Sequence, residues 1–135
     1  LNQGGIGYVH AIAHQLGAVY GVPHGRANAI VLPYILDFNE KASRKRLAEL
    51  ARSIKLVDSN ANDLDAANNF ITRTKQLIEE LNINLVVDKI DDLHFDGIIA
   101  SAFTEAHGTY AVPKYMSKSH AKSILNSIKQ PLATA

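Results

Sequence analysis

The stretch from residue 7 to residue 33 constrains the fold of this chain more than any other. Its first half is apolar around nearly the whole circumference of a helix, which predicts that a buried helix ends near Gly17. The segment that follows breaks the helix, because Gly21 and Gly25 tolerate positive φ and Pro23 cannot continue a helix. A second apolar helix is predicted over residues 26–39, with a kink at Pro33.

Three of the six histidines lie around this predicted corner. His10 and His14 are four residues apart and therefore share one face of the first helix. His24 follows the break, so the three imidazoles can converge on one point. That geometry is typical of a site for zinc, iron, copper or nickel. Taken singly, such histidines are more often core residues than ligands, and this alternative stays open at this point.

The remaining sequence predicts further helices and no sheet. Helical periodicity is found over residues 41–54, from a cap at Asn62 to about residue 81, from Asp91 or Asp92 to about residue 106, and over 118–129 after a cap at Ser117. Residues 82–87 contain β-branched side chains but have no partner strand, so we expect a loop there. We expect residues 108–116 to be irregular and residues from 131 to form a frayed tail. The predicted architecture is all-α.

Composition limits the chain to one domain and excludes several classes of protein. The chain has 135 residues, of which 47% are hydrophobic and 20% charged, as in ordinary globular proteins. A net charge of +1 gives no basic field for nucleic acid, and no apolar run reaches the length of a membrane span, so we expect neither partner. The absence of cysteine excludes disulfides and thiolate ligands and is compatible with the cytoplasm, where we expect the protein. The chain lacks an initial Met and enters the histidine segment almost at once, so we expect it to be a piece of a longer chain.

Residues 10–29, which read HAIAHQLGAVYGVPHGRANA, resemble the signature of the iron-containing (group III) alcohol dehydrogenases. That signature is His-x-x-x-His-x-x-Gly followed, after a short loop, by Pro-His-Gly-x-x-Asn. The sequence matches it at His10, His14, Gly17, Pro23, His24, Gly25 and Asn28. The resemblance implies that residues 1–135 form the metal-binding helical C-terminal domain of this family, a bundle-like domain of the dehydroquinate synthase-like type. The family's N-terminal NAD(P)-binding domain would then be absent.

The resemblance also implies a division of labour among the histidines. The family holds a metal, usually Fe²⁺ and sometimes Zn²⁺, with one Asp and three His. Two of these ligands match His10 and His24, and the other two would lie upstream of residue 1. The family residue that matches His14 is not a ligand but lies near the nicotinamide and the substrate. This match makes His14 the candidate for both proton relay and cofactor contact.

The implied activity is the interconversion of small primary alcohols and aldehydes with NAD or NADP, by metal-assisted hydride transfer. The resemblance implies a homo-oligomer, a dimer in the full-length enzyme, and we expect the 135-residue fragment alone to be inactive. Two alternatives stay open, namely a glycerol dehydrogenase-like polyol oxidoreductase and a non-catalytic helical scaffold or oligomerisation fragment. A zinc metalloprotease is excluded because Ala11 stands where the His-Glu-x-x-His motif requires Glu.

Several other residues are assigned a more ordinary role. The family often has Asn-Pro-Arg where this chain has Val-Pro-Lys at residues 112–114, and His107 just before it is a weak further candidate for the site. His94 and His120 are interpreted as surface residues, and Arg26 as a solvated or interface charge. Asn28 is as compatible with helix packing as with function.

Overall fold

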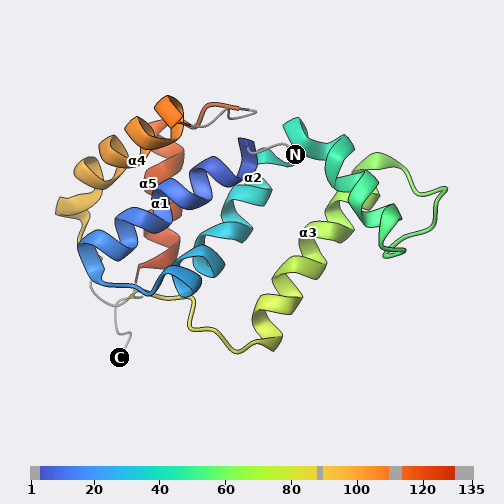
Figure 1. Ribbon diagram of the computed structural model, residues 1–135, viewed down its shortest axis with the longest axis horizontal. Helices are drawn as coiled ribbons and strands as arrows, with labels where there is room; N and C mark the ends of the chain where they lie inside the picture. Colours follow the sequence, from blue (N-terminus) through green and yellow to red (C-terminus); the bar gives the residue numbers. More distant parts are fainter. Residues whose placement is uncertain (1–3, 88–89, 110–113, 130–135) are drawn as a thin grey trace.

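The computed structural model describes residues 4–87, 90–109 and 114–129, and helices dominate these ranges (Figure 1). In chain order they are α1 (Gly4–Tyr20), α2 (His24–Ser53), α3 (Asp63–Glu80), the 3-10 turn η1 (Asp92–His94), α4 (Phe95–Thr109) and α5 (Lys118–Ile128). Within the described ranges, β pairing is limited to one parallel bridge between Val87 and Lys129, so the loop predicted at 82–87 is confirmed. The predicted all-α class is therefore correct. The segment around Pro113 and the tail from Pro131 lie outside the described residues.

The predicted helix caps are confirmed by their hydrogen bonds. The side chain of Asn62 accepts from the N–H of Asp65 at 2.8 Å and begins α3. Ser117 accepts from the N–H of His120 at 3.1 Å and begins α5. Of the two aspartates considered for the fourth predicted helix, Asp91 is the cap, and it begins η1 rather than α4. Each cap satisfies a backbone donor that has no partner within the first turn.

Helix α2 corrects the prediction of two separate helices at 26–39 and 41–54. The structure has one helix of 30 residues that starts at His24, directly after Pro23, and contains Pro33. An ion pair crosses the predicted gap, because Arg44 donates to the carboxylate of Glu40 at 2.6 Å. Since residues four apart meet on one helix face, this pair favours continuous helix where the sequence has neither glycine nor proline.

Two other helices are longer than predicted. Helix α1 continues for three residues beyond Gly17 and ends at Tyr20, directly before Gly21, whose φ of 71° is the left-handed conformation that glycine adopts readily. Helix α4 likewise continues to Thr109, beyond the expected end near Ala106. Among the described helices, none combines the length and the apolar character that crossing a membrane requires.

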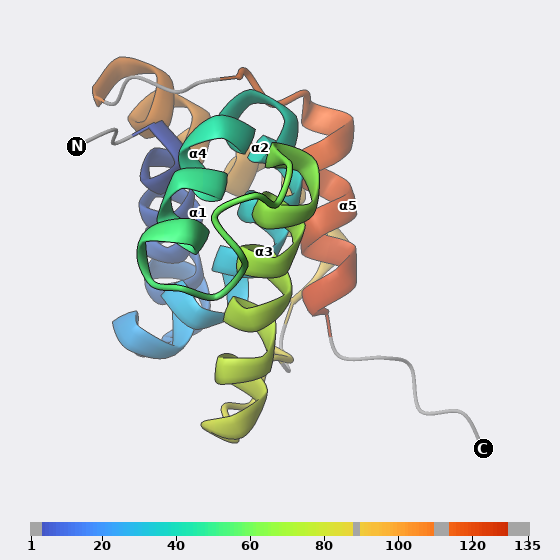
Figure 2. The same cartoon turned by 90° about the vertical axis from the view of Figure 1, so that its right-hand side faces the viewer.

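One hydrophobic core joins α1, the first half of α2, α4 and α5 (Figure 1). Helix α1 contacts both α2 and α4, whereas α5 contacts α4 and α2. The second half of α2 leaves this core and pairs with α3, so that α3 stands on the far side of α2 from α1 and α4 in both views (Figure 2). The largest fully buried side chains of the main core are Tyr8, Leu16, Ile30, Val31, Ile35, Leu125 and Ile128.

Arg26 fastens the segment after α3 to the start of α2. Its Nε donates to the carbonyl of Asn84 at 2.9 Å and its second guanidinium nitrogen donates to the carbonyl of Val86 at 2.5 Å. The sequence analysis interpreted Arg26 as a solvated or interface charge and did not predict these two hydrogen bonds to the backbone. The guanidinium lies against backbone and holds the chain that enters the bridge at Val87.

Candidate metal centre

The corner between α1 and α2 brings His10, His14 and His24 together. The ring centres of His10 and His24 are 6.1 Å apart, with the ring planes only 14° from parallel. The ring centre of His14 is 6.2 Å from that of His10 and 5.9 Å from that of His24. The three imidazoles thus occupy the vertices of a nearly equilateral triangle, as their spacing in the sequence predicts.

A short turn produces this convergence. The N–H of Gly21 donates to the carbonyl of Gly17 at 2.9 Å, which closes the last turn of α1. Val22 is buried in the main core, and Pro23 then caps α2 with an extended backbone. Because only three residues separate the helices, α2 folds back beside α1 and its first residue, His24, returns to the face that carries His10.

The start of α2 also orients the ring of His24. Asn28 lies one helical turn further on, and its Nδ2 is 3.2 Å from Nε2 of His24. The side-chain oxygen of Asn28 is buried and has no protein partner. An amide nitrogen can only donate, so Nε2 of His24 accepts this hydrogen bond, and Asn28 contacts a site histidine from within α2.

Glu105 of α4 is a member of the site that sequence reasoning missed. Its two carboxylate oxygens lie 2.9 and 3.0 Å from Nδ1 of His14. The two residues are 91 positions apart, and no local motif surrounds Glu105. The only available signal was its place next to the buried face of α4, which carries Ala102 and Ala106.

His10 and His24 have the donor chemistry of a divalent-metal site. Two imidazoles on one tetrahedral ion, with bonds of about 2 Å, would place their ring centres about 5 Å apart. The 6.1 Å separation therefore requires the two rings to approach by about 1 Å. In the described part of the chain, no group of three or more His, Cys, Asp or Glu side chains is arranged to hold an ion. The pair fits a metal by its chemistry without forming a closed ligand set.

The other three histidines lie at separate positions. His107 was the weak further candidate for the site. Its Nε2 is hydrogen-bonded to the hydroxyl of Tyr8 at 2.6 Å. His94 is exposed and pairs with the hydroxyl of Tyr20 at 3.0 Å. His120 is also exposed, and its ring packs against Phe38, with centres 4.6 Å apart. The prediction that His94 and His120 are surface residues is confirmed.

Tyr8 is a buried anchor of α1 rather than a reactive group. Its hydroxyl accepts from the N–H of Met116 at 2.8 Å and forms a second hydrogen bond with Nε2 of His107. Burial raises the pKa of the Tyr8 phenol above its ordinary value of 10.0, the hydrogen bond from Met116 lowers this pKa, and Tyr115 raises it further. The phenol therefore stays neutral at ordinary pH.

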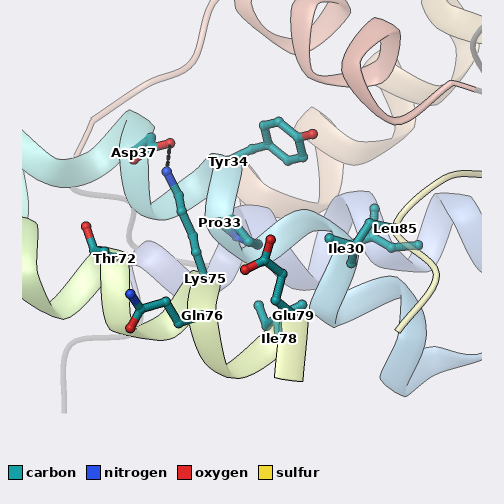
Figure 3. A pocket seen from close by; sticks show the side chains of 10 residues that line it. All are labelled: Ile30, Pro33, Tyr34, Asp37, Thr72, Lys75, Gln76, Ile78, Glu79 and Leu85. Carbon is teal, nitrogen blue, oxygen red and sulfur yellow. Dashed lines mark hydrogen bonds and ion pairs between the residues drawn. The ribbon is translucent and has the colours of Figure 1, made fainter. Parts of the chain in front are cut away.

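A cavity of about 370 Å³ between α2 and α3 is a separate candidate site (Figure 3). It is lined by Ile30, Pro33, Tyr34, Asp37, Thr72, Lys75, Gln76, Ile78, Glu79 and Leu85. Lys75 reaches across it to the carboxylate of Asp37 at 2.8 Å, which neutralises both charges (Figure 3). None of the three converging histidines lines this cavity, so it does not add ligands to the metal site.

Comparison with known proteins shows the family of the chain. The family model described as "Fe-containing alcohol dehydrogenase family, C-terminal" matches residues 1–129. The NADPH-dependent butanol dehydrogenase of Clostridium saccharobutylicum is 31% identical over 128 residues, covering 91% of this chain and 32% of that protein. The 1-propanol dehydrogenase of Citrobacter freundii is 39% identical over 93 residues, covering 67% of this chain and 25% of that protein.

A solved structure supports the same assignment. The crystal structure of a 1,3-propanediol oxidoreductase superposes with a TM-score of 0.76 at 28% identity, covering 90% of this chain and 32% of that chain. The present chain thus spans about a third or less of the length of the relatives that it matches. The resemblance carried by the histidine signature is confirmed, and the chain belongs to the Fe-containing alcohol dehydrogenase family, in its C-terminal helical part.

Proposed function

We propose that this chain is the metal-binding helical half of an NAD(P)-dependent alcohol dehydrogenase that interconverts primary alcohols and aldehydes. The observation that carries the proposal is the triangle of His10, His14 and His24, with sides of 5.9 to 6.2 Å. His10 and His24 are the proposed metal ligands. His14 is the proposed contact to cofactor and substrate.

The donor set suits the chemistry of alcohol oxidation. A divalent ion held there, Fe²⁺ or Zn²⁺, would favour the alkoxide form of the alcohol and polarise the aldehyde carbonyl in reverse. Neutral imidazoles leave the positive charge of such an ion uncompensated, which this task requires. NAD or NADP, held mainly by a domain outside this chain, would accept the hydride. His10 and His24 therefore contribute position and neutral donors.

His14 supplies the proton acceptor. When an alcohol is oxidised, its hydride goes to the cofactor and its hydroxyl proton has to go to a base. An imidazole exchanges protons readily near neutral pH. The side chain of His14 is 49% exposed, so it has access to substrate, and its ring centre lies about 6 Å from both proposed ligand rings. These features support the relay role for His14 and not for the buried Tyr8.

Primary alcohols are the favoured substrate class. The names of the three relatives above specify butanol, 1-propanol and 1,3-propanediol. The last two compounds carry only primary hydroxyls, whereas glycerol also carries a secondary one, and this favours a primary-alcohol enzyme over the glycerol dehydrogenase-like alternative. Dimer formation and a cytoplasmic location stay predictions from the family resemblance.

Steady-state kinetics tests the proposal. The chain is assayed alone and as part of the longer product of its own gene, with 1-propanol, 1,3-propanediol or glycerol, NAD⁺ or NADP⁺, and added Fe²⁺ or Zn²⁺. We expect turnover of the primary alcohols by the longer protein only. Turnover by the 135 residues alone would refute the prediction that the fragment is inactive. A strong preference for glycerol would favour the polyol alternative, and a metal-loaded longer protein without turnover would favour the scaffold alternative.

A further inference from the structure

We infer that Glu105 is the positioning residue for His14, and that it holds the imidazole as the Nδ1–H tautomer so that Nε2 is the nitrogen that exchanges a proton with the substrate. The inference rests on the proposed function of His14. It adds a residue from α4 to a site whose other side chains come from α1 and α2. It also assigns each ring nitrogen of His14 a separate task.

The geometry of the pair fixes which nitrogen carries the proton. A carboxylate can only accept hydrogen bonds, and both oxygens of Glu105 lie within 3.0 Å of Nδ1 of His14. Nδ1 therefore has to donate. In a neutral imidazole the other nitrogen, Nε2, then carries the lone pair. Proton transfer balances in this arrangement, because the alcohol proton goes to Nε2 while the hydride goes to the oxidised nicotinamide of the cofactor.

Packing between α1 and α4 makes the pair a defined contact. Ala102 and Ala106 are fully buried on either side of Glu105 in the sequence, and they set the face of α4 that meets α1. The hydroxyl of Tyr8 joins the same two helices through His107. Only 26% of the Glu105 side chain is exposed, which is less than for the other carboxylate of α4 that forms an ion pair, Asp96, at 86%.

Asp96 provides a matched control for the test. It lies on the same helix as Glu105, but its ion-pair partner is Lys122, at 3.5 Å, and not one of the three site histidines. An exposed ion pair of this kind contributes little to stability. Glu105→Ala and Asp96→Ala therefore remove the same charge from the same helix, and only the first removes the partner of His14. Glu105→Asp restores the carboxylate on a shorter side chain.

The first readout is the tautomer of His14, measured by ¹H–¹⁵N NMR of ring nitrogens at about pH 8.5, where ordinary imidazoles are neutral. The signals are assigned among the six histidines with His14→Gln. We expect the Nδ1–H form in the parent and in Asp96→Ala, a shift to the Nε2–H form in Glu105→Ala, and partial recovery in Glu105→Asp. An unchanged His14 tautomer in Glu105→Ala would overturn the inference, and so would an Nε2–H parent.

The second readout is the kinetics of alcohol oxidation in the metal-loaded enzyme that contains this chain. We expect Glu105→Ala to lower kcat about 10- to 100-fold with KM nearly unchanged, Glu105→Asp to recover part of it, and Asp96→Ala to have no effect. A kcat equal to that of Asp96→Ala would overturn the positioning role even if the tautomer shifts. If the parent enzyme oxidises no alcohol, the proposed function fails, and the tautomer measurement alone decides whether Glu105 orients His14.

Discussion

Replacing Tyr8 by Phe tests how α1 is fixed in the core that supports the histidine corner. Tyr8 is fully buried, and its ring lies 6.0 Å, centre to centre, from those of Phe38 and Phe103. Tyr8→Phe keeps these ring contacts and creates almost no cavity. It removes only the hydroxyl, which accepts from the buried N–H of Met116 and is hydrogen-bonded to Nε2 of His107.

The expected loss follows from these two hydrogen bonds. The bond to His107 contributes about 1 kcal/mol, and an N–H of Met116 left without a partner in the core costs about 1 to 2 kcal/mol more. We therefore expect Tyr8→Phe to lower the free energy of unfolding by about 2 to 3 kcal/mol. For a chain of this length that corresponds to a fall in Tm of about 8 to 12 °C. Urea unfolding followed by circular dichroism measures the difference.

The same variant carries a pH prediction. Burial raises the pKa of the Tyr8 phenol in the folded protein, so the folded state prefers the neutral form. This preference stabilises the fold fully below the unfolded pKa of about 10 and is lost as pH rises through the folded pKa. The parent should therefore lose stability above about pH 10 that Tyr8→Phe does not lose. The difference between the two proteins should shrink there.

Tyr20→Phe is the control for both measurements. The hydroxyl of Tyr20 makes contacts of the same kind, to His94 at 3.0 Å and to the N–H of Asp91 at 3.3 Å, but both are exposed to water. Water replaces the lost partner at an exposed site, so we expect a loss below about 1 kcal/mol. Equal losses in Tyr8→Phe and Tyr20→Phe would refute the argument that burial of the Tyr8 hydroxyl decides the cost.

Four further substitutions test local elements of the fold by urea unfolding. Arg26→Ala removes the donors to the Asn84 and Val86 carbonyls and should cost about 1.5 to 2 kcal/mol; a loss below about 0.5 would mean that the clamp does not contribute. Gly21→Ala should lower the free energy of unfolding by about 1 to 2 kcal/mol, because φ at this position is 71°. Gly25→Ala should be neutral or stabilising, because a Cβ added at this position of α2 meets open space. If Gly25→Ala lost more stability than Gly21→Ala, the assigned turn would be contradicted. Asn62→Ala should cost about 1 kcal/mol through loss of the α3 cap, and an unchanged stability would show that water replaces the cap.

Local patterns predicted most of the helices and their starts. Caps at Asn62, Asp91 and Ser117 act within three residues, so the sequence itself contains both partners of each hydrogen bond. Helix ends were less predictable, because α1 continues through Gly17 and ends at Tyr20, just before Gly21. Nothing in the sequence distinguishes these two glycines by composition. The helix stops before Gly21 because the turn to α2 needs a positive φ at that residue.

The continuity of α2 across residue 40 was not predicted. The continuously apolar pattern of residues 26–39 gives way to the amphipathic pattern of residues 41–54, so dividing the segment there was a reasonable interpretation. The helix is continuous because its first half is buried in the main core and its second half packs against α3. Such tertiary contributions to a helix of 30 residues do not show in a local window.

The histidine site likewise has a part that the sequence predicts and a part that it does not. His10, His14 and His24 lie within 15 residues, so helical spacing and one turn suffice to predict that they meet. Glu105 reaches His14 from 91 residues away through the packing of α4 on α1, and no spacing rule covers that distance. The roles of the two proposed ligands and of the relay stay predictions that rest on the family resemblance.

Metal content of single histidine variants is the most direct test of these roles. Each of His10→Gln, His14→Gln and His24→Gln is prepared in the full-length protein, loaded with Fe²⁺ or Zn²⁺, dialysed and assayed for bound metal per chain. We predict that His10→Gln and His24→Gln lose the metal, whereas His14→Gln keeps it and loses only turnover. Loss of metal from His14→Gln to the same extent, or full retention by His10→Gln or His24→Gln, would contradict the proposed division between ligands and relay.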